Sequence, residues 1–489
     1  MKVLFVASEG LPFSKTGGMA DVVEALPKSL ITLGHEVAVL LPAYRNTRTI
    51  GVAVPKLEIA MGAALRYPAI LDGGVLNGVH YYFVDDPEYF DRDQLYGEAG
   101  KDYPDNAERY AEFCRAAIEF TKHVWMPDII HCHDWQSALI PVLLRTEYAT
   151  DAAVEAVTTI FTIHNLGYQG LFSRETMEKI GLPASLFRVD AMEFYGRVGF
   201  LKGALVFADY LTTVSRKYAQ EIQTPDYGHG LDGVVRNRSD RLAGILNGVD
   251  YSVWSPGIDK LIAKKYSPRD LSGKLACKKN LLEVFGLSAE GVGRPLIGIV
   301  SRFANQKGFD LIADVAPELL AEDLSMVVLG TGEPKYEKMF QDLTTIYPSK
   351  ISVRVAYDEA LAHKIEAGAD MFLMPSRYEP CGLNQIYSLR YGTVPVVRAT
   401  GGLDDTVEAF DPLTGRGTGF KFQEYDGIAM LGAICEALAV FRNEPVIWRR
   451  IQIKGMTKDF SWRPSAIEYA RLYEKVWKSR NRKAVLTSN

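Results

Sequence analysis

Short apolar runs bounded by polar loops recur along the first half of the chain. Continuous runs of this length are typical of strands that are buried on both faces of a parallel sheet. They occupy residues 3–7, 36–41, 80–84, 129–132 and 159–163. Patterns with helical spacing, such as 20–33 and 106–123, separate them. Pro27 lies inside the first of these helices and predicts either two short helices that meet there or one kinked helix.

The same alternation of strand, loop and helix starts again near residue 295. The apolar run 295–300 precedes a polar loop and a helical pattern over 309–320. Further expected strands cover residues 326–329, 351–355, 371–374 and 394–397. Between the two halves, residues 246–256 are rich in turn-forming residues and are the expected hinge. We therefore predict an α/β protein of two doubly wound, Rossmann-like domains that face an interdomain cleft, with ligands bound at the carboxyl ends of the strands.

The composition is that of a folded globular protein. Of the 489 residues, 47% are hydrophobic and 24% are charged, which excludes disordered, fibrous and collagen-like classes. The formal net charge of -5 gives no electrostatic reason to expect nucleic acid as a partner. No apolar stretch approaches the roughly 18 residues that a membrane-spanning helix needs, and the apolar start is too short for a signal peptide. We expect neither segment in this chain.

The cysteines are few and widely spaced. They lie at positions 114, 132, 277, 381 and 435. An odd number of cysteines without a CxxC pair favours neither a disulfide framework nor a structural zinc site. We therefore expect a reducing, cytoplasmic location.

Two loops that follow expected strands carry cationic side chains. The segment 15–18 starts with Lys15 and ends with Gly18, and glycines before a helix N-terminus provide unpaired N–H groups for an anion or a sugar. The same segment is also typical of a plain surface loop, since it has neither Walker nor GxGxxG spacing. In the second half, Arg302 and Lys307 share a loop and are suited to hold two phosphates. Two solvated loop cations are the alternative interpretation.

A carboxylate follows another buried strand of the second half. Glu379 comes soon after the run 371–374, so we expect it at the carboxyl end of a strand, where a helix opens. A carboxylate there can bind sugar hydroxyls, and capping of the helix is the structural alternative. Cys381 lies beside it, but no histidine is near in sequence to activate a thiolate. We expect no cysteine nucleophile.

Histidines and an aspartate close two strands of the first half. His131, His133 and Asp134 end one strand, and His164 follows another, so all four side chains are expected near one cleft. Zinc is one interpretation of this group. Against it, we expect His131 and His133 to point to opposite sides of the extended chain, and there is no HExxH motif or cysteine pair. Buried histidines with satisfied hydrogen bonds are the favoured interpretation.

One more acidic pair is a candidate cation site. Asp91 and Asp93 are separated by a single residue in an expected loop. Isolated acidic pairs in loops are usually solvated surface. We therefore predict no metal for this chain.

Several motifs together resemble one known family. They are KTGGMAD at 15–21, HDW at 133–135, HNL at 164–166, LNGVD at 246–250, SR at 301–302 with QKG at 306–308, and EPCGL at 379–383. In these motifs the chain resembles bacterial glycogen synthases and plant starch synthases. The resemblance runs from the first strand to residues 459–462 and keeps the order of the family. Each motif is weak alone, and the set is specific.

The resemblance implies the GT-B architecture of two Rossmann domains and a retaining glycosyltransferase. The implied reaction moves glucose from ADP-glucose to the non-reducing 4-hydroxyl of an α-1,4-glucan such as glycogen, with no cofactor. An acceptor-side domain is implied over 1–245 and a nucleotide-sugar domain over 246–456. A C-terminal helix within 457–489 is implied to cross back to the first domain. Neither nucleic acid nor membrane is among the implied partners.

The resemblance also assigns roles to single residues. Those implied at the donor's phosphates and glucose are Lys15, Gly18, Arg302 and Lys307. Those implied near the donor sugar or in its binding loop are Asn247, Glu379, Cys381, Gly382 and Leu383. Asp134 and His164 are implied at the acceptor side and the reacting carbon. Tyr96 and Tyr357 are similar to family positions at the sugar and the adenine.

Two positions depart from the family's pattern. Asn384 stands where many relatives have threonine, so its side-chain contacts are expected to differ. Cys132 stands where alanine is usual. That change adds a buried thiol and is expected to leave the chemistry unaltered.

The expected chemistry breaks a glycosyl phosphate bond through a cationic transition state while negative charge grows on the diphosphate. Arg302 and Lys307 would stabilise that charge as preorganised cations, and Glu379 would orient and stabilise the sugar. His164 would lie beside the anomeric centre, acting through its imidazole or its backbone carbonyl. Nothing in the sequence identifies a carboxylate nucleophile. We therefore favour same-face attack, in which the leaving phosphate helps to deprotonate the acceptor.

Two functions of other classes stay open at this point. A nucleotide-sugar epimerase can use the same double-Rossmann fold, because fold does not determine function. A non-catalytic glucan-binding protein is the other alternative. The presence of Lys15, Arg302 and Lys307 favours an enzyme. No local motif separates ADP-glucose from UDP-glucose.

Overall fold

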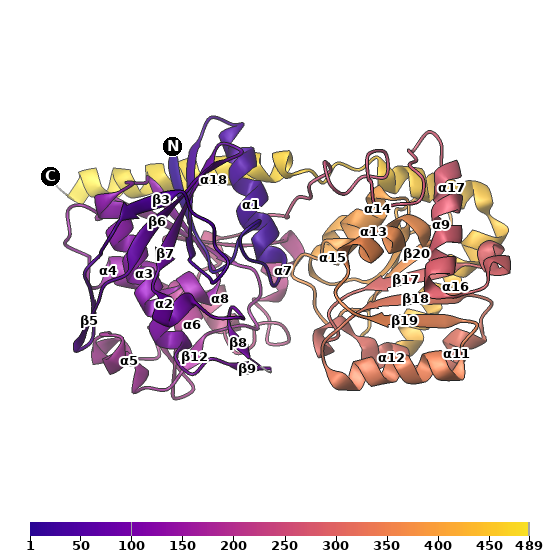
Figure 1. Ribbon diagram of the computed structural model, residues 1–489, viewed down its shortest axis with the longest axis horizontal. Helices are drawn as coiled ribbons and strands as arrows, with labels where there is room; N and C mark the ends of the chain where they lie inside the picture. Colours follow the sequence, from indigo (N-terminus) through magenta and orange to yellow (C-terminus); the bar gives the residue numbers. More distant parts are fainter. Residues whose placement is uncertain (99, 488–489) are drawn as a thin grey trace. The chain divides into compact units, whose positions relative to one another are not determined.

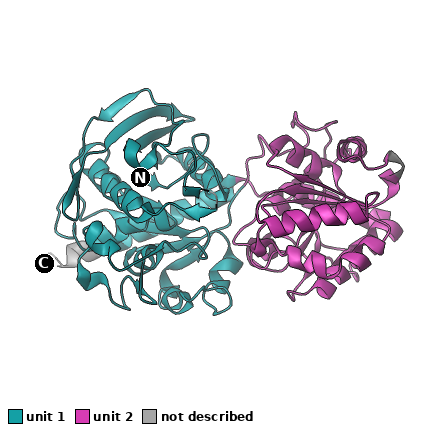
Figure 2. Cartoon of the chain, turned by 60° about the horizontal axis from the view of Figure 1, so that its bottom comes forward, with its two compact units in different colours: residues 1–248, 462–489 teal, residues 249–461 magenta. Residues whose placement is uncertain are grey.

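The computed structural model describes residues 1–98 and 100–487, which form two compact units (Figure 2). Unit 1 combines Met1–Gly248 with the C-terminal segment that begins at Trp462, and unit 2 is Val249–Ser461. The first boundary lies inside the turn-rich segment that was expected to be the hinge. Each unit has its own sheet and its own cores, so each is described separately.

Unit 1 is built on a mixed sheet with the strand order β16-β15-β11-β10-β1-β2-β7-β6-β3. These strands are β1 (Lys2–Val6), β2 (Glu36–Pro42), β3 (Gly51–Val54), β6 (Ala69–Leu76), β7 (Val79–Asp85), β10 (Ile129–His133), β11 (Thr158–Ile163), β15 (Tyr210–Thr213) and β16 (Leu242–Gly244). From β16 to β7 all neighbours are parallel, and β6 and β3 add an antiparallel edge. Short antiparallel strands outside this sheet are β4 (Ile59–Met61), β5 (Ala64–Arg66), β8 (Gly97–Glu98), β9 (Lys101–Asp102), β12 (Leu171–Phe172), β13 (Glu193–Phe194) and β14 (Arg197–Gly199).

Helices cover both faces of this sheet (Figure 1). They are α1 (Gly18–Ile31), α2 (Pro87–Phe90), α3 (Asn106–His123), α4 (Leu139–Arg145), α5 (Thr176–Lys179), α6 (Phe200–Phe207), α7 (Arg216–Glu221), α8 (Asp232–Arg236) and α18 (Trp462–Thr487). Side chains alternate along each strand, and the first strand shows the result. Val3 and Phe5 pack in the core with α1 and α18, whereas Leu4 and Val6 pack with α3 and α4. This explains the continuous apolar run that predicted the strand.

A single helix, α1, spans Pro27. The sequence left open two short helices or one kinked helix, and the structure has one element that starts at Gly18. Val22, Val23 and Leu26 of this helix are buried in the same core as the first strand. Packing of this apolar face holds the helix together despite the N–H that proline lacks.

The C-terminal helix α18 belongs to unit 1 although unit 2 precedes it in the chain. Tyr469 and Tyr473 of α18 are fully buried in one core with Val3 and Phe5. The helix also starts earlier and ends later than the apolar pattern over 466–477 predicts. The structural boundaries, after residues 248 and 461, lie close to the expected ones, after residues 245 and 456.

Unit 2 is built on a parallel sheet with the order β19-β18-β17-β20-β21-β22. The strands are β17 (Leu296–Val300), β18 (Ser325–Gly330), β19 (Ile351–Val355), β20 (Met371–Met374), β21 (Val394–Arg398) and β22 (Phe420–Phe422). The helices are α9 (Ser272–Phe285), α10 (Phe309–Asp314), α11 (Ala316–Ala321), α12 (Pro334–Ile346), α13 (Glu359–Gly368), α14 (Asn384–Arg390), α15 (Gly401–Thr406), α16 (Gly427–Asn443) and α17 (Pro445–Met456). One core includes side chains of α10, α12 and α16, and a second, built around other side chains of the sheet, includes those of α9 and α13.

The helix expected over 309–320 is two helices, so this expectation was wrong. α10 ends at Asp314 and α11 starts at Ala316. Pro317 is the cause, because it lies in the first turn of α11, where a missing N–H is tolerated, and its ring would clash with a continuous preceding turn. Among the described residues, no helix is both long and apolar enough to cross a membrane.

The burial of α18 leads to a prediction about stability. Leu472 is buried in the core with Phe5, so Leu472→Ala should lower the unfolding free energy of unit 1 by about 2–5 kcal/mol. Hydrogen exchange should then accelerate in β1 and α1 but not in β17 and β18. The matched control is Glu474→Ala on the exposed face of the same helix, expected to change stability by less than about 0.5 kcal/mol. Unchanged exchange in β1 for Leu472→Ala would refute the prediction.

Candidate functional site

The strand order of unit 2 reverses at β17. From β17 the chain first adds β18 and β19 on one side and then adds β20, β21 and β22 on the other. In open parallel sheets, ligands bind outside the carboxyl ends of the two strands at such a reversal. Here the loop 301–308 follows β17 and the loop 375–383 follows β20. These loops carry Arg302, Lys307 and Glu379, so the topology places the predicted donor residues at the expected end of the sheet.

Lys307 and Glu379 form an ion pair at this reversal point. Lys307 Nζ lies 2.6 Å from Glu379 Oε2, and Ser376 Oγ donates to the same oxygen at 3.0 Å. Glu379 is only 6% exposed, so its carboxylate is held in one place. Arg302 is exposed and forms no ion pair with any residue that the structure describes. The structure thus joins two of the predicted residues and leaves the third open to solvent.

Glu379 does not open a helix, which corrects the sequence-based expectation. The next helix, α14, starts at Asn384, and the backbone carbonyl of Glu379 instead accepts a hydrogen bond from the N–H of Gly402 at 3.0 Å. Gly401 has φ +46°, and a Cβ there would lie 1.9 Å from the Glu379 carbonyl oxygen. Only glycine allows this approach. The motifs did not indicate a role for these glycines, although a glycine pair after a buried strand is a signal for a close backbone approach.

The loop after Glu379 is packed rather than free. Cys381 is buried, which agrees with the expectation that it is not a nucleophile. Gly382 and Leu383 are half-buried. A Cβ on Gly382 would lie 2.5 Å from Gln385 Oε1, at φ +69°. Asn384, the departure from the family pattern, donates from Nδ2 to the carbonyl of Val300 at 2.7 Å. This bond ties the start of α14 to the end of β17.

Unit 1 has the same kind of reversal at β1. From β1 the sheet adds β2 and β7 on one side and β10, β11 and β15 on the other. The loop that follows β1 contains Glu9 and Lys15 and leads into Gly18, the first residue of α1, and Asp134 directly follows β10. His164 follows β11, the next strand along. The unit 1 residues predicted from the motifs therefore gather at the carboxyl ends of three neighbouring strands.

Glu9, a residue not predicted from the sequence, organises the glycine loop. Its carboxylate accepts hydrogen bonds from the N–H and hydroxyl of Thr16 and, at 3.2 Å, from the N–H of Gly17. The hydroxyl of Tyr96 donates to Glu9 at 3.1 Å and also bonds Ser8 at 2.8 Å. Burial raises the pKa of Glu9 above its ordinary value. Its place directly after the first strand was the available signal.

Lys15 is anchored beside this loop. Its ammonium pairs with Asp21 of α1 at 2.7 Å, and Gly18 is the first residue of that helix. Burial raises the pKa of Asp21, whereas the charge of Lys15 lowers it. Lys15 and Gly18 are both exposed. The arrangement provides a cation and a helix N-terminus side by side.

His131 and His133 point to the same side, so the prediction of opposite sides was wrong. Residues two apart on a strand share a face. Their ring centroids are 4.2 Å apart, and His133 Nδ1 lies 2.9 Å from His164 Nε2. His131 bonds Tyr473 at 2.8 Å and Thr162 at 2.6 Å. Protein partners therefore occupy both nitrogens of His131.

Asp134 holds the turn that carries His164. Its Oδ1 accepts from the backbone N–H of His164 at 2.8 Å, and the N–H of Asn165 also bonds this carboxylate. Asp134 has φ +54°, a conformation that non-glycine residues rarely adopt and that is enriched at functional sites. Burial raises the pKa of Asp134 to about 7 and lowers the pKa of His164 to about 3. The two predicted residues are thus adjacent, and the histidine is neutral.

Two further predicted residues follow other strands, Asn247 after β16 and Tyr357 after β19. Asn247 is 5% exposed, and its Oδ1 is buried without a hydrogen-bond partner in the described part of the chain. An unmet acceptor of this kind is available for a ligand donor. Tyr357, soon after β19, is 81% exposed. Its ring is therefore open to solvent, where it could stack on a base.

The acidic pair considered as a cation site is bound by arginine. Arg45 Nε lies 2.7 Å from Asp91, and the same guanidinium pairs with Asp93. Within residues 1–98 and 100–487, no group of three or more histidine, cysteine, aspartate or glutamate side chains could hold a metal ion. The pair is therefore an ion-pair network on the surface.

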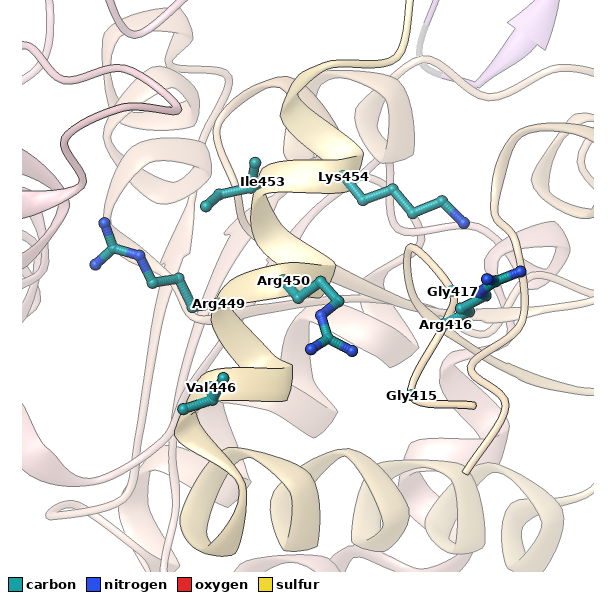
Figure 3. Close-up of a pocket in the computed structure, with 8 residues that line it drawn as sticks. All are labelled: Gly415, Arg416, Gly417, Val446, Arg449, Arg450, Ile453 and Lys454. Carbon is teal, nitrogen blue, oxygen red and sulfur yellow. The ribbon is translucent and has the colours of Figure 1, made fainter. Parts of the chain in front are cut away.

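A basic hollow of ≈ 620 Å³ lies elsewhere in unit 2, between α17 and the loop 415–417 (Figure 3). Arg450 and Lys454 project from one side of α17 towards Arg416. Lys454 pairs with Glu408. None of the residues predicted for the donor lines this hollow, so its volume does not identify the reaction site.

Family models match both halves of the chain. The model described as starch synthase catalytic domain matches residues 2–237, and that of glycosyl transferases group 1 matches residues 287–439. The glycogen synthase of Koribacter versatilis is 58% identical over 97% of this chain and 98% of its own length. The glycogen synthase of an Anaeromyxobacter species is 48% identical over 97% of this chain and 99% of its own.

Solved structures agree with these matches. The catalytic domain of starch synthase IV from Arabidopsis thaliana, bound to ADP and acarbose, superposes with a TM-score of 0.88 at 35% identity, covering 97% of this chain and 99% of that one. Sucrose-phosphate synthase from Thermosynechococcus elongatus, with a TM-score of 0.61 at 17% identity over 98% of this chain and 99% of its own, supports the fold alone. The family and the α/β fold class predicted from the motifs are confirmed. The chain therefore belongs to the glycogen synthase family of bacteria, GT-B glycosyltransferases related to the starch synthases.

Proposed function

We propose that this chain transfers glucose from ADP-glucose to the non-reducing 4-hydroxyl of an α-1,4-glucan, with retention at the anomeric carbon. Family membership supports glucosyl transfer in glycogen synthesis and favours it over the epimerase and binding-protein alternatives. The choice of donor is supported by the starch synthase IV structure, which is bound to ADP and acarbose. No cofactor takes part in the proposed reaction.

The observation that carries the proposal is the ion pair between Lys307 and Glu379 at the reversal point of unit 2. One N–H of the ammonium is directed at Glu379, at 2.6 Å, and its other N–H groups remain for an anion. Arg302, in the same loop, adds a forked guanidinium that matches phosphate oxygens. Preorganised cations are most effective where charge develops on a leaving group. We assign both residues to the diphosphate.

Glu379 is proposed to orient the donor sugar rather than to attack it. Its carboxylate already accepts from Lys307 and Ser376, which lowers its availability as a nucleophile. Retention then follows from attack on the same face as the departing phosphate. The acceptor oxygen bonds to the anomeric carbon, the bond from that carbon to phosphate oxygen breaks, and the acceptor proton passes to the phosphate. No covalent glucosyl intermediate forms on this route.

The remaining roles follow the family resemblance. Unit 1 is proposed as the acceptor side, with Asp134 and His164 at the reacting carbon, and unit 2 as the donor side. Lys15 and Gly18 are assigned to the phosphates and glucose. The residues assigned to the rest of the donor are Asn247, Tyr96, Tyr357, Cys381, Gly382 and Leu383. A cytoplasmic location is part of the proposal and is supported by the five free thiols.

The donor can be tested directly. Purified protein should transfer label from radioactive ADP-glucose into precipitated glycogen, and the incorporation should require the glucan. Incorporation from UDP-glucose is expected to be much slower. A preference for UDP-glucose would overturn the proposed nucleotide and keep the reaction, whereas no incorporation by folded protein from either donor would reject the transferase proposal.

The phosphate contacts can be tested by removing one cation at a time. Lys307→Ala and Arg302→Ala should each lower kcat about 100- to 1000-fold, because each removes a group that stabilises the developing charge. The matched control is Lys338→Ala, an exposed lysine of α12 that pairs with Asp342 in the same unit. It should change kcat less than about twofold. Near wild-type turnover in either site variant would remove that residue from the diphosphate.

The raised pKa of Asp134 predicts a pH dependence. If its ionised carboxylate supports the cationic transition state, kcat/KM should fall as pH drops through about 7, where Asp134 gains a proton. This loss is not acid unfolding, because a pKa above the unfolded value makes protonation favour the folded state. Asp134→Asn should be slower but flat over about pH 6–8. An acid limb near 7 that persists in Asp134→Asn would contradict the assignment.

A further inference from the structure

His133 is a buried histidine whose contacts lead to one side chain of the proposed reaction centre. Its Nδ1 lies 2.9 Å from His164 Nε2. Its other nitrogen, Nε2, is buried and has no hydrogen-bond partner among the described residues. Among the described residues, His164 is therefore the only side chain that hydrogen-bonds to the ring of His133. No role in the mechanism described above has used this contact.

The environment of His133 selects one direction for this hydrogen bond. A neutral imidazole carries a single proton, so one ring donates and the other accepts. If His164 donated from Nε2, the proton of His133 would sit on its buried Nε2, where nothing accepts it. Buried N–H groups without an acceptor are rarer than buried acceptors without a donor. The proton of His133 is therefore on Nδ1, and His164 Nε2 is the acceptor.

Both rings are neutral, so the tautomer is defined. Burial and the neighbouring histidines lower the pKa of His133 well below its ordinary value, and burial lowers the pKa of His164 to about 3. Each ring then holds one proton throughout the neutral range. With Nε2 of His164 acting as acceptor, its single proton sits on Nδ1.

Packing fixes the ring of His133 in the orientation that this bond needs. Phe5 stacks on it with ring centroids 5.3 Å apart and an interplanar angle of 18°, and the His131 ring lies 4.2 Å away. His131 is itself held by Tyr473 of α18 and by Thr162 of β11. A donor whose rotamer is locked by packing positions its partner with little loss of freedom.

We propose that His133 is a positioning residue that holds His164 as its Nδ1–H tautomer, so that His164 presents a hydrogen-bond donor to a substrate oxygen. In the described structure no protein group accepts from His164 Nδ1, and the side chain is half-buried. A donor there acts on an oxygen atom of the sugar and does not act as a general base. The proposed effect of His164 on the substrate rests on the proposed glucosyl transfer. The tautomer itself is a property of the protein without substrate.

The tautomer can be measured without any substrate. In protein with ¹⁵N-labelled histidine, protonated and unprotonated ring nitrogens differ in chemical shift, and the His164 signals are identified by their loss in His164→Gln. We expect the protons of both His133 and His164 on Nδ1 and no titration between about pH 5 and 8. A proton on His164 Nε2 in the wild-type protein would overturn the inference. Failure of the transferase assay would leave this result untouched, so the two proposals are separable.

Two substitutions test the effect on turnover. In His133→Asn the amide nitrogen is attached to Cγ, as Nδ1 is, so the donor is kept; in His133→Leu it is lost. We expect His133→Leu to lower kcat about 10- to 100-fold with little change in KM, and His133→Asn to recover most of it. The matched control is Cys132→Ala, a buried neighbour on the opposite face of β10, expected to be near wild type. Equal activity of His133→Leu and the wild type, or equal losses in His133→Leu and His133→Asn, would reject the positioning role.

Discussion

Both clusters depend on one constraint, the parallel strand order that reverses at β1 in unit 1 and at β17 in unit 2. At each reversal the two loops that leave neighbouring strands run in opposite directions, which opens a crevice at the carboxyl ends of those strands. Backbone N–H groups and side chains from distant parts of the sequence therefore meet there. The sheet cores that impose this order determine where the proposed contacts lie, and in unit 1 the core residue Phe5 packs directly against His133.

Burial shapes the two clusters in different ways. In unit 1 the polar groups are desolvated, so Glu9 and Asp134 have raised pKa values and His164 a lowered one. In unit 2 the key carboxylate is compensated by a cation, because Lys307 lies against Glu379. Desolvation therefore dominates the electrostatics of the unit 1 cluster, whereas a pair of opposite charges dominates those of the unit 2 cluster.

The strands and helices were predictable from the sequence because apolar runs indicate which local segments are buried. Contacts between residues far apart in the sequence were not predictable in this way. No local sequence pattern indicates that Lys307 pairs with Glu379, because their pairing requires the strand order that places β17 beside β20. The role of Glu9 was missed for a similar reason, because its partners lie in the loop that folds back onto it. The error on His131 and His133 was of another kind. The two-residue period of a strand already places them on one face, so the sequence contained that answer.

The path of α18 has a consequence for the synthesis of this protein. Unit 1 is closed by a helix from the end of the chain, whereas unit 2 is one uninterrupted segment. On the ribosome, domains that emerge first usually fold first. Here α1 can cover part of one face of the sheet early, but the part that α18 covers has to wait until this helix, which follows unit 2, has left the exit tunnel. The apolar side chains that pack against α18 stay exposed for that interval, and exposed apolar surface of this kind promotes aggregation.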